Sequence, residues 1–155
     1  MGEEEGNQGD LHALAQLRAF LEEDLSLWRR LGDLARHTEA AWIALVSQGN
    51  ALARETIRRE SRRLGEELQG KSATPLERLM IDQIVVLQLE VQYLEIRAAE
   101  SSGGTGRQVG VLLKRLESAQ CRYLAAIMTL TLVRKLALGE DARSRLRVYS
   151  RGHAG

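Results

Sequence analysis

Apolar residues recur at helical spacing over most of this chain, and this periodicity limits the folds open to it. An apolar residue returns every seven positions at Leu14, Leu21, Trp28, Ala35 and Trp42. Recurrence at three, four and seven positions lines one face of an α-helix. The 155 residues include one proline and few aromatic residues, a composition that argues against strands and their turns. The sequence therefore predicts an all-α fold.

Helix-ending residues divide the periodic stretches into about four helices. The first begins at Asp10, a candidate N-cap, and ends before Gly49, which suits a left-handed C-cap. If Gly49 does not break the helix, one long rod continues into the next stretch. The second helix, from Asn50 to about Gln69, is mostly charged and carries a narrow apolar stripe. We expect it to lie on the outside of the fold.

The third helix begins at the sharpest local signal in the chain. Thr74 is a candidate N-cap, Pro75 fits the first helical position, and Glu77 completes a capping box. This helix is broadly apolar, and we expect it to be central to the core. A glycine-rich loop over 101–106 separates it from a last helix that we expect to end at Leu138, with Gly139 as its C′ residue.

These boundaries predict one domain with two tails. Residues 1–9 form a disordered acidic tail, residues 10–139 an antiparallel bundle of about four helices with one long N-terminal helix, and residues 140–155 a basic flexible tail. The acidic start does not resemble a signal peptide, and no apolar run is long enough to span a membrane. One cysteine suits a reducing compartment, so we expect a cytoplasmic protein.

The sequence shows no constellation typical of catalysis, metal binding or cofactor binding. The three histidines lie far apart, and none has a partner at metal-binding spacing. Cys121 has no nearby histidine, so we expect a buried small apolar residue rather than a nucleophile. The segment 103–107 precedes a helix but matches no phosphate-binding motif, which favours a flexible loop. We therefore expect no catalytic, cofactor-binding or metal residues, no cofactor, and no enzymatic activity.

The mismatch in helix length points to protein–protein interaction. The first helix should overhang the others, so part of its apolar stripe would lack a partner within the chain. Leu21, Trp28 and Trp42 are the candidate partner-binding residues on that stripe. We expect a helical interaction or regulatory protein that acts by coiled-coil self-association, as a homo-oligomer, or by packing against a partner's helix.

Arginine-rich segments support nucleic-acid binding as an alternative. Arg58 and Arg62 share one line of the second helix, although interleaved glutamates favour a solvated, salt-bridged face. The tail has no acidic residue after Asp141, and its candidate contacts are Arg143, Arg145, Arg147 and Arg151. A net charge of +1 gives no global attraction to nucleic acid or to a membrane surface, so this remains the alternative.

Three segments together resemble a group of small helical bacterial proteins with no assigned activity. They are T-E-A-A-W-I from Thr38, T-P-L-E-R-L from Thr74, and R-Y-L-A-A from Arg122 running on to L-V-R-K-L at Leu136. The resemblance covers about residues 38–138 and implies a bacterial cytosolic protein. It implies no ligand and no site.

Overall fold

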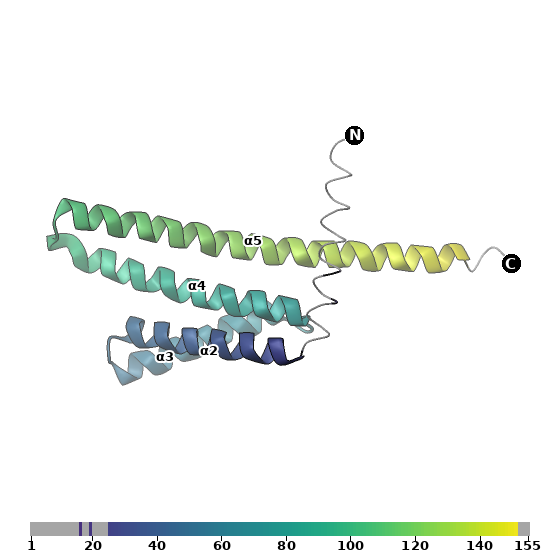
Figure 1. Ribbon diagram of the computed structural model, residues 1–155, viewed down its shortest axis with the longest axis horizontal. Helices are drawn as coiled ribbons and strands as arrows, with labels where there is room; N and C mark the ends of the chain where they lie inside the picture. The colour runs from purple at the N-terminus through teal and green to yellow at the C-terminus, as the bar shows by residue number, and fades with distance from the viewer. Residues whose placement is uncertain (1–15, 17–18, 20–24, 152–155) are drawn as a thin grey trace.

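The protein is all-α over the part of the chain that its computed structural model describes. The structure describes Gln16, Ala19 and residues 25–151, with side chains at Gln16, Ala19, 30–101 and 103–140. Its helices are α2 (Leu25–Ser47), α3 (Ala51–Gln69), α4 (Pro75–Glu100) and α5 (Gly106–Arg151), with a short 3-10 turn, η1 (Ser101–Gly103), between the last two (Figure 1). These described residues include no strand. The predicted helical bundle is confirmed.

The helices form three layers, with α4 in the middle. α5 runs antiparallel to α4 on one side, while α2 and α3 pack on the other (Figure 1). Because α4 is covered from both sides, it supplies most of the buried apolar side chains, namely Leu76, Ile81, Ile84, Val85, Leu87, Leu89 and Leu94. The prediction that this helix is central to the core is confirmed.

The start of α4 is fixed by the capping box that the sequence predicts. The backbone N–H of Glu77 donates to the Thr74 hydroxyl at 3.2 Å, and the Thr74 N–H donates to the Glu77 carboxylate at 2.9 Å. Pro75 occupies the first turn, where no helical N–H is needed. Each of these orphan N–H groups gains an acceptor, so the helix begins at a defined residue.

The turn between α2 and α3 forms at Gly49, so the chain does not continue as one rod. Gly49 has φ 82°, a left-handed conformation that favours glycine. Asn50 then caps α3, because its side chain accepts a hydrogen bond from the Ala53 N–H at 3.0 Å. The predicted break and the predicted cap are both confirmed.

The last helix extends beyond its predicted end. α5 continues through Gly139 to Arg151, so the predicted helix end at Leu138 is wrong. A glycine inside a helix costs about 1 kcal/mol relative to alanine, which the helix-forming residues on either side can offset. The arginines of the predicted flexible tail, residues 140–155, therefore belong to a helix that ends at Arg151. Residues 152–155 lie outside the described part of the chain.

The N-terminal helix is described only in part. The predicted acidic tail and most of the predicted helix before Leu25 lie outside the described residues. Among the described helices, α5 is the longest. Within α2, Ile43 and Val46 are buried, whereas Leu45, three residues after Trp42 of the stripe, is exposed. The packed face of α2 is thus rotated relative to the predicted stripe.

Within the described part of the chain, no helix combines the length and apolarity that crossing a membrane requires.

Candidate functional site

One side of α5 holds the helix against the rest of the molecule. Ala119, Leu130 and Val133 are buried there against α4. Arg122 donates to Glu90 of α4 at 2.9 Å, which adds a polar contact between the two helices. Near the start of α4, Arg134 donates to the Leu68 carbonyl and lies beside Glu77. These contacts fix which side of α5 faces inward.

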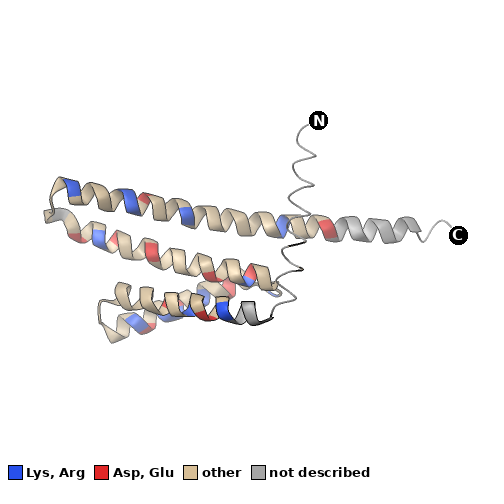
Figure 2. Cartoon of the chain, viewed as in Figure 1, with Lys and Arg blue, Asp and Glu red and all other residues tan. Residues whose placement is uncertain are grey.

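The opposite side of α5 carries a second set of large apolar side chains, which we call the outer face. Its members are between 51% and 71% exposed, and they are Leu113, Leu124, Met128, Leu132 and Leu138. At about 100° per residue they fall within a sector of about 120°, centred about 160° around the helix from the buried side. No charged residue interrupts α5 between Arg122 and Arg134, as Figure 2 shows. Between these two arginines the outer face is therefore free of charge, and Glu117 and Lys135 lie on it just beyond.

The outer face is not among the surfaces predicted from the sequence. The apolar line of α5 that faces α4 passes through residues such as Leu112, Leu116 and Leu130. The signal for a second line is the four-residue recurrence of Leu124, Met128 and Leu132. A helix that is apolar on two sides normally needs a neighbour on each.

Cys121 lies beside the outer face and is exposed. The expectation that it is a buried apolar residue is wrong, because α5 packs on one side only and residue 121 lies away from that side. No group of metal-ligating side chains surrounds it among the described residues.

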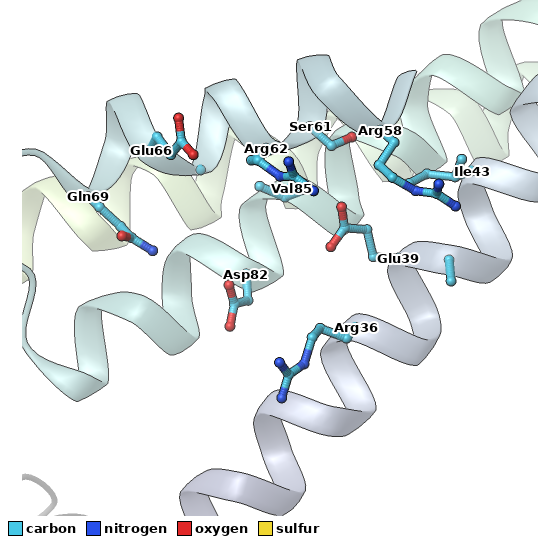
Figure 3. A pocket seen from close by; sticks show the side chains of 12 residues that line it. Arg36, Glu39, Ile43, Arg58, Ser61, Arg62, Glu66, Gln69, Asp82 and Val85 are labelled. Carbon is cyan, nitrogen blue, oxygen red and sulfur yellow. The ribbon is translucent and has the colours of Figure 1, made fainter. Parts of the chain in front are cut away.

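A second candidate is an open polar cleft of about 480 Å³ between α2, α3 and α4. Arginines and acids from all three helices line it (Figure 3). The arginines are Arg36, Arg58 and Arg62, and the acids are Glu39, Glu66 and Asp82. Positive and negative charges are equal in number, so the cleft has no net attraction for an ion of either sign.

Two carboxyl groups in this cleft, those of Glu39 and Asp82, have a raised pKa. Burial raises the pKa of Glu39, the nearby charge of Asp82 raises it further, and Arg58 and Arg62 oppose these effects. Burial also raises the pKa of Asp82, against the opposing effect of Arg36. Perturbed carboxyl groups occur at active sites and also in structural ion networks. Because each acid here faces arginines of its own chain, the arrangement resembles a structural network that joins three helices.

The predicted partner-binding residues differ from the outer face. Trp42 packs inward, where its ring lies 5.6 Å from the Tyr93 ring of α4 with the planes tilted by 57°. Trp28 lies on α2, but its side chain is outside the described ones, as is all of Leu21. The structure therefore places Trp42 in the contact between α2 and α4.

The predicted nucleic-acid-binding arginines lie in two separate places. Arg58 and Arg62 line the polar cleft, and Arg58 also pairs with Glu55 at 3.5 Å. The other four, Arg143, Arg145, Arg147 and Arg151, lie on the last turns of α5, and their side chains are outside the described ones.

No known protein family, curated protein or solved structure matches this chain. The resemblance to small helical bacterial proteins therefore stays a prediction.

Proposed function

We propose that this protein is a non-enzymatic helical interaction protein, whose outer face on α5 packs against a helix of another polypeptide. The observation that carries the proposal is the stripe of large apolar side chains that α5 turns away from its own core. Single exposed apolar residues are common, but a contiguous stripe is typical of a protein-binding surface. Covering such side chains yields about 25 cal/mol per Å² of apolar surface removed from water.

The composition of the outer face favours a helical partner. Leucine and methionine at successive turns provide knobs that fit the grooves of another helix, as in coiled coils. Methionine also adapts its shape to the surface that it meets. Self-association and packing against a different protein both satisfy this requirement. The exposed free thiol of Cys121 favours a reducing, cytoplasmic setting, and a bacterial origin follows from the resemblance of three segments.

Site-specific photo-crosslinking tests this proposal in cells that express the protein. A benzophenone amino acid replaces Met128 on the outer face, and a matched variant carries it at Leu52 on α3. These positions are similarly exposed, at 71% and 78%. We expect a discrete crosslinked product, of doubled mass or with another protein, from position 128 and not from position 52. Equal crosslinking at both positions, or none at position 128, contradicts the proposal.

Nucleic-acid binding is a second candidate because the arginines of the last segment are part of α5. The four-residue spacing of Arg143, Arg147 and Arg151 puts them on one line of that helix. A row of this kind can follow a phosphate backbone. Replacing all three by glutamine should then weaken binding to a DNA duplex and flatten its salt dependence, whereas no duplex binding by the unmodified chain at physiological salt rules the candidate out.

A further inference from the structure

Two residues of opposite charge lie on the line that runs along the middle of the outer face. Glu117 and Lys135 are both exposed, and at about 100° per residue they point in the same direction around α5, between Leu124 and Met128. Neither makes an ion pair within the described part of the chain. Charges within an apolar contact stripe are costly unless the partner neutralises them.

Two pairs of residues on the outer face are symmetric in position about residue 126. Glu117 lies nine residues before this point and Lys135 nine residues after it, while Leu124 and Met128 lie two residues before and after it. If a second α5 lies antiparallel with its residue 126 at the same level, Glu117 of each helix meets Lys135 of the other. Leu124 of each helix then meets Met128 of the other at the centre.

We infer that the occupant of the outer face is a second copy of this chain, whose α5 packs antiparallel across a twofold axis at the level of residue 126. This inference rests on the proposed function and specifies its partner. A twofold contact uses the same surface on both subunits, so one stripe must be complementary to itself, with both signs of charge at equal distances from the axis. Glu117 and Lys135 satisfy that condition, since each lies about 13.5 Å along the helix from the axis.

The parallel arrangement lacks this complementarity. In register, it would place Glu117 opposite Glu117 and Lys135 opposite Lys135, and like charges that face each other are destabilising. It would also bring the two Cys121 residues to one level. In the antiparallel arrangement, the two Cys121 positions lie about 15 Å apart along the helix axis, too far for a disulfide.

The length of α5 fits a second copy. α5 has 46 residues and α4 has 26, so at 1.5 Å per residue α5 is about 30 Å longer. It extends past the start of α4, and none of the other described helices lies beside this extension (Figure 1). In the antiparallel pair this extension lies along the first turns of the other α5. There Gly139 faces Leu113 of the second copy. The space beside Gly139 is open in the monomer, since a Cβ at this position would have no neighbour within 4 Å.

A charge-swap series in the full-length protein tests the pairing. Glu117→Lys alone places lysines opposite Lys135 at both ends of the contact, and Lys135→Glu alone places glutamates opposite Glu117. Because each dimer loses two ion pairs and gains two repulsions, we expect each single variant to dimerise about tenfold more weakly by sedimentation equilibrium. The double variant should recover the original dimer affinity. Glu95→Lys, on an exposed position of α4, is the matched control and should change nothing.

Disulfide trapping fixes the direction of the two helices. In a Cys121→Ser background, Glu117→Cys combined with Lys135→Cys should give a crosslinked dimer on mild oxidation, while either cysteine alone should not. Efficient crosslinking of Cys121 to Cys121 in the unmodified chain, or of a single variant to itself, shows a parallel contact. That result overturns this inference and leaves the proposed interaction through the outer face intact.

A monomer at every concentration up to the solubility limit also overturns the inference. The photo-crosslinking at Met128 then decides the proposed function separately, because a product with a different protein supports it and the absence of any product contradicts it.

Discussion

Glu77 provides the most direct test of how α5 is held to the rest of the molecule. Its carboxylate accepts from the Thr74 N–H at 2.9 Å, and its other oxygen lies 3.8 Å from the Arg134 guanidinium. Arg134 also donates to the Leu68 carbonyl at the end of α3. The Glu77 side chain is only 8% exposed. If it is removed, water therefore compensates little for the lost hydrogen bond to Thr74 and the lost contact with Arg134. One buried carboxylate thus joins the start of α4 to α5.

Glu77→Ala should lower the free energy of unfolding by about 2–3 kcal/mol. Loss of the capping-box acceptor accounts for about 1 kcal/mol. The remainder, about 1–2 kcal/mol, comes from a half-buried Arg134 that keeps its charge and loses the acid 3.8 Å away, since a buried polar group that loses its partner costs about 1–3 kcal/mol. For a chain of this length, the change corresponds to a fall of roughly 5–10 °C in Tm.

Urea unfolding followed by circular dichroism measures the effect, with the protein concentration held constant because association shifts apparent stability. Glu67→Ala is the matched control, since Glu67 also lies near an arginine, Arg63 at 3.7 Å, but is exposed. We expect the control to cost no more than about 0.5 kcal/mol. In a double-mutant cycle, Glu77→Ala and Arg134→Ala should couple by about 1 kcal/mol. Independent effects, or a cost for Glu77→Ala equal to the control's, would refute the reasoning.

Three further predictions concern the core, the cleft and the turn. Ile84→Ala should cost about 3 kcal/mol in urea unfolding, because Ile84 is fully buried between layers and its removal leaves a cavity. Burial raises the pKa of Asp82, so the folded state binds more protons than the unfolded chain above the ordinary value of 3.8, and the contribution of this carboxyl to stability falls as the pH rises through that window. Asp82→Asn should therefore stabilise the protein at pH 7, as measured by urea unfolding, and lose that advantage below pH 3.8. Gly49→Ala should lower Tm because φ is 82° there, whereas Gly32→Ala, inside α2 with open space beside it, should raise it.

Local signals in the sequence predict the helix boundaries well where a side chain determines them. The capping box at Thr74 and Glu77 and the cap at Asn50 depend on residues three positions apart, so they can be recognised without knowledge of the tertiary fold. Arg134 as the partner of Glu77 could not be predicted in this way. It lies 57 residues away, and the two meet only because α5 runs antiparallel to α4.

Positions that depend on which side of a helix is packed were predicted less well. Cys121 was expected to be buried because free cysteines usually are, but it lies on the unpacked side of α5. Gly139 was expected to end the helix. The helix continues, because no described element follows that would require the chain to turn at this glycine. Periodicity identifies an apolar line without saying whether the same chain covers it. This is why the outer face was missed although its residues are visible in the sequence.

The layered arrangement connects these observations. α4 is apolar on two sides and is covered on both, by α5 and by the pair α2 and α3. α5 is also apolar on two sides, but only one of them is covered within the described chain. A second copy packed on the outer face would give α5 the environment that α4 already has, with a helix layer on each side. The same physical requirement that places α4 at the centre of the monomer would then place the two α5 helices at the centre of a dimer.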